Sequence, residues 1–358
     1  MRNGRIRVSH FQRRSGLTGN FSLERVFTDV RAALPPTVEC ALKVCRYQRG
    51  VVRRLLNMFR AALDQGDVNH ILGDVHYLAL FLRKNRTILT IADCIGLTDP
   101  RWLRRAIRKY LWYVIPIRRV AIVTVISDAT KSELVRQIGV PPSKVQVVPC
   151  CVSPSFTPVA RDFDPANYRV LHIGTGRNKN LTRLVDAVRG LPCELRIIGR
   201  LDSGQQRCLD QSGVRYTAAF NLNDAQMVSE YRACDIVAFV STYEGFGLPI
   251  LEAQASGRPV VTSNIMSMPE VAGDGACLVD PFDAASIRAG VERVASDSVY
   301  RRHLVTCGLS NVTRYTQDVI AGMYADLYEK VASGFTDAHV ACREDGLASA
   351  TESRARLR

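Results

Sequence analysis

Two glutamates eight residues apart frame a short glycine-rich loop in the stretch STYEGFGLPILEA, residues 241–253. The preceding run DIVAFV has the apolar character of a buried strand. Pro249 suits the first turn of a helix, because its missing N–H is not needed there. The loop therefore places the backbone N–H groups of Phe246, Gly247 and Leu248 at a helix N-terminus, where an anion such as phosphate binds.

The two acids, Glu244 and Glu252, need another ligand group, because a carboxylate beside a phosphate is repelled. A carboxylate accepts hydrogen bonds, and the hydroxyls of a sugar or a ribose donate them. A ligand with a sugar at each end of a diphosphate satisfies both acids, and Gly245 lets the chain approach it closely. The stretch thus indicates a nucleotide-sugar site; the simpler alternative is a capped helix start with two exposed acids.

The elements that must position this loop alternate between strand-like and helical patterns, which is typical of α/β layers with parallel sheets. Strand-like runs are RIRVSHF, VNHILG, TILTIA and VAIVTVI in the first half and RVLHIG, CELRIIG, DIVAFV, PVVTS and ACLVD in the second. Helical patterns lie between them, near residues 22–34, 47–64, 76–84, 101–115, 180–190, 203–212, 223–232 and 249–256. Residues 149–167 hold four prolines and no helical period, so we expect a linker there.

The string Glu-Gly-Phe-Gly-Leu-Pro, with Glu252 eight residues after Glu244, resembles the signature of the family 4 retaining glycosyltransferases, in particular a bacterial mannosyltransferase-like group. The resemblance extends to SGRPVV, SMPEVAGDGACLVDP and ISDATKSELV and covers most of residues 68–332. It implies the GT-B fold, in which two Rossmann-like domains enclose a cleft for donor and acceptor. It also implies a hexosyltransferase that retains the anomeric configuration of the sugar.

The same resemblance implies that the two domains have different roles. Residues 1–155 are expected to form the acceptor-side domain and residues 156–333 the domain that binds the nucleotide-sugar. The last helix, about 316–333, is expected to pack back on the first domain. Residues 334–358 are polar and weakly periodic, and we expect them to be disordered.

A second part of the donor site is expected in HIGTGRNKNLTRL, which reads as a strand, a glycine-rich turn and a helix. Arg177 and Lys179 in the turn are suited to neutralise a diphosphate. In the family the corresponding basic residues stabilise the departing nucleotide diphosphate, so we assign them, with Glu244, to the catalytic residues; an ordinary solvated turn is the alternative. Gly174 and Gly199, which follow two strands, are assigned to donor binding.

No metal or other cofactor is expected, because basic groups in place of a divalent cation fit the family. The Asp-x-Asp formed by Asp162 and Asp164 lies in the expected linker beside no phosphate loop, and we interpret it as a solvated turn. The chain has 11 cysteines, scattered and without a Cys-x-x-Cys pair. This pattern indicates reduced thiols and argues against a disulfide framework and a zinc site.

The acceptor side is expected to use the loop SGLTGN, in which Gly16 and Gly19 provide flexibility, after the first strand. His76 and His10 are further candidates for acceptor binding, whereas His70, inside a strand, is expected to be a core histidine.

One position departs from the family pattern. Relatives commonly read Thr-Ile-His-Asp where this chain reads TILTIADC, so Ala92 stands in place of a histidine that touches the donor sugar. Asp93 is then a candidate catalytic residue that compensates for the missing histidine.

The net charge of +14 is concentrated in the first half. Residues 1–155 carry 26 Lys and Arg and 10 Asp and Glu, a net charge of +16, and the remainder carries −2. Such an asymmetry predicts an anionic partner for the first domain. Residues 101–113 and 49–60 have apolar and basic residues at helical spacing, as in a helix lying on an anionic membrane; an amphipathic helix packed on the sheet is the alternative.

These observations predict a cytoplasmic protein at the inner face of a membrane. No run of about 18 apolar residues predicts a membrane span, and the N-terminus lacks the apolar core of a signal peptide. The expected partners are a UDP- or GDP-sugar donor and a glycan or lipid-linked acceptor, and no nucleic-acid motif accompanies the charge. Two alternatives remain: a catalytically impaired nucleotide-sugar-binding protein, and a basic membrane- or nucleic-acid-binding module with a vestigial donor site.

Overall fold

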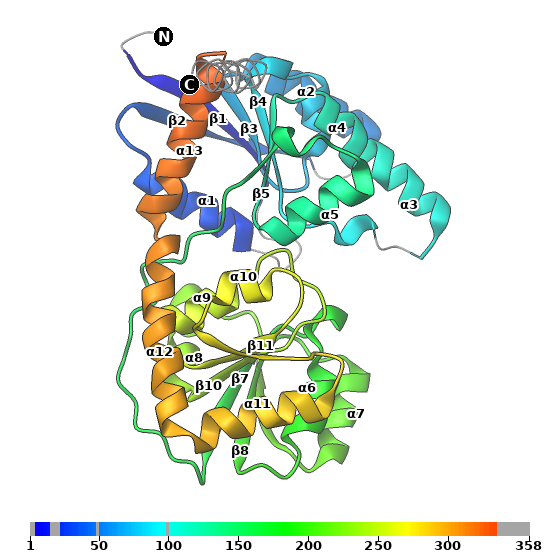
Figure 1. Cartoon of the computed structure of the whole chain (residues 1–358). Helices are drawn as coiled ribbons and strands as arrows, with labels where there is room; N and C mark the ends of the chain where they lie inside the picture. The colour runs from blue at the N-terminus through cyan, green and yellow to red at the C-terminus, as the bar shows by residue number, and fades with distance from the viewer. Residues whose placement is uncertain (1–3, 15–21, 48–49, 98–99, 335–358) are drawn as a thin grey trace, which may run out of the picture.

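Two six-stranded parallel sheets, each flanked by helices, form the two domains of the chain (Figure 1). The computed structural model describes residues 4–14, 22–47, 50–97 and 100–334. The predicted α/β class with two Rossmann-like domains is confirmed. The predicted acceptor-loop glycines, Gly16 and Gly19, and the predicted disordered tail beyond Gly334 lie outside the described residues.

The first sheet has the strand order β2-β1-β3-β4-β5-β6. Its central strands are short and fully buried, as expected for a parallel sheet covered on both faces. The strands are β1 (Ile6–Arg13), β2 (Val38–Cys45), β3 (Val68–Ile71), β4 (Thr87–Ile91), β5 (Ile122–Val125) and β6 (Val145–Val147). The helices are α1 (Ser22–Ala33), α2 (Val51–Leu63), α3 (Trp102–Arg108), α4 (Ile115–Arg118) and α5 (Asp128–Ile138).

Two predicted helical segments of this domain differ from expectation. The pattern near residues 76–84 forms two short 3₁₀ turns, His76–Leu80 and Lys84–Arg86, rather than an α-helix. The pattern near residues 101–115 begins as α3 and continues as the π-helix Lys109–Val114 before α4. Further 3₁₀ turns cover Ile95–Leu97 and Pro142–Lys144.

The second sheet has the order β12-β11-β10-β7-β8-β9. Its strands are β7 (Tyr168–Ile173), β8 (Cys193–Ile198), β9 (Arg215–Ala219), β10 (Ile236–Phe239), β11 (Val260–Ser263) and β12 (Ala276–Val279). Its helices are α6 (Leu181–Val188), α7 (Ser203–Ser212), α8 (Asp224–Ala233), α9 (Leu248–Ala255), α10 (Met268–Ala272), α11 (Ala284–Ser296) and α12 (Ser298–Val312), with a 3₁₀ turn at Arg177–Lys179.

Two segments of chain connect the domains. Residues 148–167 form no helix or strand, where the sequence predicts a linker. At the other end, α12 and the 3₁₀ turn Thr313–Tyr315 lead to α13 (Gln317–Ala332). Helix α13 packs against α1 and against β1 and β3 of the first domain (Figure 1). The chain therefore ends, in its described part, on the domain in which it began.

Tyr328 of α13 joins a buried polar network in the first domain. Its hydroxyl lies 2.7 Å from Nε2 of His10 and 2.8 Å from Nδ1 of His70, and Nε2 of His70 lies 2.6 Å from Oγ1 of Thr90. Burial lowers the pKa of both imidazoles, to about 3 for His70, so both are neutral. His70 is a core histidine as predicted. His10 is equally inaccessible, so the prediction that it binds the acceptor is wrong.

Candidate functional site

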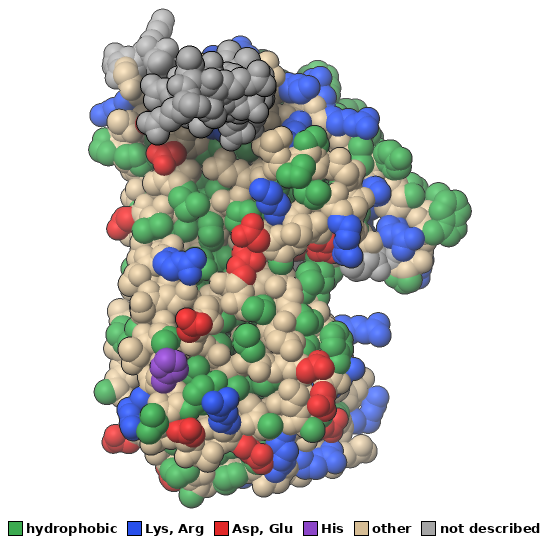
Figure 2. Space-filling view, viewed as in Figure 1, with side chains coloured by type: hydrophobic (Ala, Val, Ile, Leu, Met, Phe, Trp, Pro, Cys, Tyr) green, Lys and Arg blue, Asp and Glu red, His purple; other side chains and the backbone are tan. Residues whose placement is uncertain are grey.

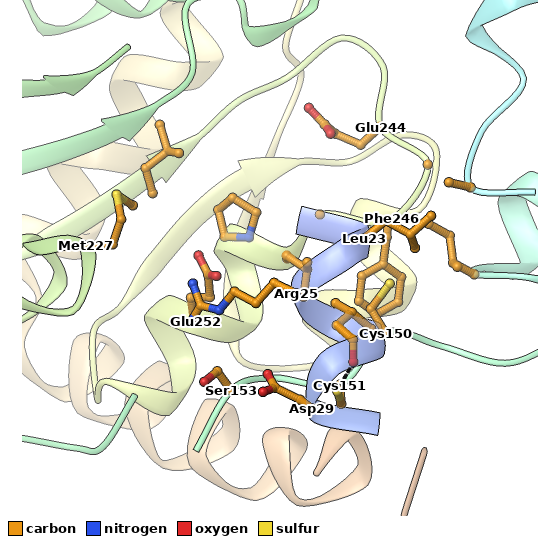
Figure 3. Close-up of a pocket in the computed structure, with 18 of the residues that line it drawn as sticks. Leu23, Arg25, Asp29, Cys150, Cys151, Ser153, Met227, Glu244, Phe246 and Glu252 are labelled. Carbon is orange, nitrogen blue, oxygen red and sulfur yellow. Dashed lines mark hydrogen bonds between the residues drawn. The ribbon is translucent and has the colours of Figure 1, made fainter. Parts of the chain in front are cut away.

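A cleft of about 410 Å³ lies between the domains and brings together segments that are distant in sequence (Figure 3). The second domain contributes the β10–α9 loop and the turn between β7 and α6. The first domain contributes α1 and the residues that follow β4. The cleft therefore lies at the carboxyl ends of strands from both sheets, which is where open parallel sheets bind ligands.

The predicted anion-binding loop, residues 244–248, is called the signature loop. Its carbonyl groups are held from outside the cleft. Ser267, which precedes α10, donates to the carbonyl oxygens of Glu244 and Phe246 at 3.0 and 2.7 Å. The carbonyl oxygen of Gly245 accepts two hydrogen bonds from the first domain. Three consecutive peptide groups are thus fixed through their oxygens.

The N–H groups of the same loop are available to a ligand. No described residue accepts a hydrogen bond from the N–H of Phe246, Gly247 or Leu248. Gly247 has a φ of +108°, a conformation that glycine adopts most easily, and Pro249 occupies the first turn of α9. Three backbone donors thus lie unpaired at the start of a helix, the arrangement that binds anions in other proteins.

Gly245 lies where the signature loop meets the first domain in the cleft. A Cβ atom at this position would lie 2.2 Å from the carbonyl oxygen of Ala92 and 3.0 Å from Cβ of Asp93. Both obstacles belong to the chain just after β4. Glycine is therefore required here because two backbones meet. The signature loop packs directly against the first domain.

Lys179 and Glu244, which both line the cleft, form an ion pair. The Lys179 Nζ lies 2.7 Å from Oε1 of Glu244, and Asn178 donates to the same oxygen at 3.3 Å. The lysine side chain runs over Gly174, where a Cβ would lie 2.9 Å from Cε, and its ammonium group stands 4.7 Å from the ring centroid of Phe239. The cation is thereby held beside the signature loop.

Glu252 lies one helical turn into α9, and its carboxylate faces the cleft (Figure 3). Tyr231 donates its hydroxyl to Oε2 at 2.6 Å, and Arg25 of α1 points toward the same carboxylate. Burial raises the pKa of Glu252, and both of these neighbours lower it in part. The acid is oriented by Tyr231, and its Oε1 accepts no hydrogen bond from the described residues.

Sequence models of two glycosyltransferase families match the two domains. The model described as "Glycosyltransferase Family 4" matches residues 27–156, and the model described as "Glycosyl transferases group 1" matches residues 167–297. The second match contains both signature glutamates. The chain belongs to the family 4 glycosyltransferases.

Curated relatives of this glycosyltransferase include bacterial mannosyltransferases. It is 27% identical over 259 residues to the O-antigen chain mannosyltransferase B of Escherichia coli, covering 65% of this chain and 68% of the relative. It is 29% identical over 252 residues to the MMP alpha-(1->4)-mannosyltransferase of Mycolicibacterium hassiacum, covering 64% of this chain and 60% of the relative. Against the serotype-specific mannosyltransferase WbdA the match spans only 12% of the relative.

Solved structures show that the glycosyltransferase has the predicted GT-B fold. Sucrose-phosphate synthase from Thermosynechococcus elongatus superposes with a TM-score of 0.72 at 17% identity, covering 92% of this chain and 100% of that one. Anabaena HepE, solved in complex with UDP-glucose, superposes with a TM-score of 0.74 at 15% identity, covering 91% and 100%.

Three residues predicted for the donor site, Gly174, Arg177 and Gly199, do not line the cleft of the glycosyltransferase. Arg177 is exposed and does not line the cleft, so of the two basic residues in the turn only Lys179 does. Gly199 lies behind the turn, where a Cβ would stand 2.7 Å from Cγ2 of Thr175. The absence of a side chain at Gly199 therefore leaves room for the turn.

On the acceptor side, Ala92 and Asp93 line the cleft. Oδ1 of Asp93 accepts a hydrogen bond from the N–H of Ile95 at 3.0 Å, and burial raises the pKa of the carboxyl group. His76 is buried, and its Nδ1 is bound to the carbonyl oxygen of Trp112 at 2.6 Å. The prediction that His76 binds the acceptor is therefore wrong, because no acceptor can reach it.

Sequence reasoning missed the polar side chains that the first domain and the linker bring to the cleft. Arg25 and Asp29 come from one face of α1, and Ser153 comes from the linker (Figure 3). Arg25 also bridges the cleft, since its Nη1 lies 3.0 Å from Oδ1 of Asp224 on α8. The only available signal was the i, i+4 spacing of Arg25 and Asp29, which many surface helices share.

The described residues contain no group of three or more His, Cys, Asp or Glu side chains arranged to hold a metal ion. Asp164 of the Asp-x-Asp pair accepts a hydrogen bond from the N–H of Ala166 at 2.9 Å, as in an ordinary turn. In the described part of the chain, no helix is long and apolar enough to cross a membrane.

Proposed function

We propose that this glycosyltransferase moves a hexose from a nucleotide-diphospho-sugar, a UDP- or GDP-sugar, to a glycan or lipid-linked acceptor, with retention of configuration, in the synthesis of a cell-surface polysaccharide. One observation carries the proposal. The Lys179–Glu244 pair, the unpartnered N–H groups of the signature loop and the free oxygen of Glu252 all line a single interdomain cleft. Together these groups suit a sugar, a diphosphate and a ribose.

Each group then has a role in transfer. The signature-loop N–H groups and Lys179 hold the diphosphate, and Glu252 accepts the ribose hydroxyls. When phosphate engages Lys179, the carboxylate of Glu244 becomes free to accept hydroxyls of the donor sugar. The bond from the anomeric carbon to the phosphate oxygen breaks, a bond to the acceptor oxygen forms on the same face, and the acceptor proton passes to the leaving diphosphate. Lys179 supplies the positive charge that a metal ion provides elsewhere.

The relatives support the nature of the donor. The two curated relatives that match the most of this chain transfer mannose by name, and one of them acts on an O-antigen chain. A structural neighbour of the same fold was solved with UDP-glucose. Turnover of radiolabelled nucleotide-sugars with membrane lipids as acceptors tests the proposal. Label appearing in lipid or in released sugar supports an enzyme, and donor binding without turnover supports the non-catalytic alternative.

Replacing Glu252 by alanine should weaken donor binding by roughly 1.5–3 kcal/mol, about tenfold or more, because a charge-assisted hydrogen bond to ribose is lost. Glu252→Gln should show an intermediate effect, since the amide oxygen still accepts a bond. Calorimetric titration of the two variants with the accepted nucleotide-sugar measures the difference. Donor affinity equal to that of the wild type in Glu252→Ala would remove this residue from the site.

We also propose that the first domain lies against the cytoplasmic face of an anionic membrane. Most of the large hydrophobic side chains that are exposed in the described residues lie between residues 42 and 115. On α2 they include Val51, Leu56 and Phe59, and on α3 Trp102, which is 71% exposed, and Ile107. Apolar side chains stand beside arginines and lysines on the projecting end of this domain (Figure 2). Such a mixed surface suits anionic lipid and brings the cleft to a lipid-linked acceptor.

Attachment should depend on both charge and lipid type. The triple variant Arg104→Glu, Arg105→Glu, Lys109→Glu should float far less with vesicles containing phosphatidylglycerol than the wild type does, and added salt should weaken wild-type flotation. Arg207→Glu, on α7 of the second domain, is the matched control and should float normally. Equal flotation of the wild type with vesicles of phosphatidylcholine alone would contradict an electrostatic attachment.

A further inference from the structure

The N-terminal turn of α5 makes contacts with the second domain that no motif of the donor site explains. Ser127 is the N-cap of α5, and its Oγ accepts a hydrogen bond from the N–H of Thr130 at 3.0 Å. The same hydroxyl donates to the carbonyl oxygen of Gly245 at 2.6 Å, and the Thr130 hydroxyl donates to that oxygen at 3.1 Å. Both hydroxyl-bearing residues are buried, so the first domain holds the middle carbonyl of the signature loop.

A carboxylate of the second domain completes this contact from the opposite direction. The two oxygens of Glu270, on α10, accept hydrogen bonds from the N–H groups of Asp128 at 2.8 Å and Ala129 at 3.2 Å. These are first-turn N–H groups of α5, which have no partner inside the helix and favour negative charge. Helix α10 follows Ser267, which holds the neighbouring carbonyls of the signature loop.

A third contact lies one turn further along α5. The Tyr243 hydroxyl donates to Oε2 of Glu133 at 2.7 Å and accepts a hydrogen bond from the N–H of Cys94 at 3.0 Å. Tyr243 immediately precedes the signature loop, and Cys94 follows the cleft residue Asp93. Tyr243 therefore links a segment of each domain, one beside the signature loop and one beside Asp93, to the same helix, α5.

We infer that Ser127, Thr130 and Glu133 of α5, together with Glu270, form an interdomain clamp that positions the signature loop against the acceptor domain for transfer. These are positioning residues, because none of them lines the cleft. The inference rests on the proposed function. The donor contacts come from Lys179, Glu252 and the loop N–H groups of the second domain, and Ser267 keeps the loop formed without the clamp. Loss of the clamp should therefore separate donor binding from turnover.

The test compares two clamp variants with a control. Ser127→Ala/Thr130→Val removes the donors to Gly245 with little change in volume, and Glu270→Gln removes the charge at the start of α5. Asp186→Asn, in an exposed pair on α6, is the control. In both clamp variants, kcat should fall at least tenfold while the dissociation constant of the donor stays within threefold of the wild type. A kcat within twofold of the wild type, or affinity and kcat falling together, would overturn the clamp.

A second readout does not require activity. Hydrogen–deuterium exchange in Glu270→Gln should become faster both at residues 127–130 and at residues 243–248, because each segment holds the other. Unchanged exchange at residues 243–248 would overturn the clamp even in a protein without detectable turnover. If the wild-type protein binds no nucleotide-sugar but the coupled exchange is present, the proposed function fails and the clamp stands.

Discussion

Replacing Lys179 by methionine should reduce hexose transfer by about 10²–10³-fold, the loss typical for removing one preorganised group that stabilises charge developing in the transition state. Lys179 is the basic side chain of the β7–α6 turn that lines the cleft, and its ammonium is held beside the signature loop by Glu244. Negative charge grows on the diphosphate as the donor bond breaks. Without the lysine, that charge faces Glu244 and Asp93 uncompensated.

Steady-state kinetics of three variants check this expectation. Arg177→Met, which alters the exposed arginine of the same turn, should cost much less than Lys179→Met. Arg189→Met, at the exposed C-terminal end of α6, is the control for loss of a surface charge. The wild type should keep its activity in EDTA, because the lysine takes the place of a cation. Loss of activity in EDTA that manganese or magnesium restores would contradict this role.

Replacing Gly245 by alanine should lower transfer by at least about 100-fold while leaving each domain folded. The new Cβ would lie 2.2 Å from the carbonyl oxygen of Ala92, and a backbone atom cannot move aside as a flexible side chain does. The signature loop must then move away from the first domain. A displacement of about 1 Å in a catalytic arrangement is enough to cost about 100-fold in rate.

Gly322 of α13 provides the matched control, since an added Cβ there meets nothing within 4 Å. Gly322→Ala should keep full activity and raise the melting temperature slightly, because alanine favours the helix. Both variants can be compared by kcat and by circular dichroism. Wild-type turnover in Gly245→Ala would mean that the closed contact between the domains is not the arrangement in which transfer occurs.

Much of the fold could be predicted because buried parallel strands are recognisable as short apolar runs. The β10 run DIVAFV and the β4 run TILTIA are examples. Strands β2, β6 and β9 were missed, since each lies at an edge of its sheet and is only partly buried. An edge strand carries a mixed pattern that short windows do not separate from a loop or helix.

The residues of the site that local sequence could predict differ from those that depend on long-range contacts. The signature loop, Lys179 and Glu252 lie on the second-domain side of the cleft, and local spacing together with the family resemblance was enough to select them. Arg25 and Ser127 could not be assigned, because their cleft and loop contacts depend on how two domains dock. His10 was misassigned because its partner, Tyr328, lies 318 residues away on a helix that crosses from the other domain.

The central claim is that the interdomain cleft binds a nucleotide-sugar through the signature loop and Glu252. Calorimetric titration of the wild type and of Glu252→Ala with UDP-, GDP- and ADP-hexoses tests it most directly. We expect saturable binding of a sugar carrying one of the three bases to the wild type, and at least about tenfold weaker binding of the same sugar to Glu252→Ala. Absence of binding to the wild type across the panel, or equal affinity in both proteins, would contradict the assignment of the cleft.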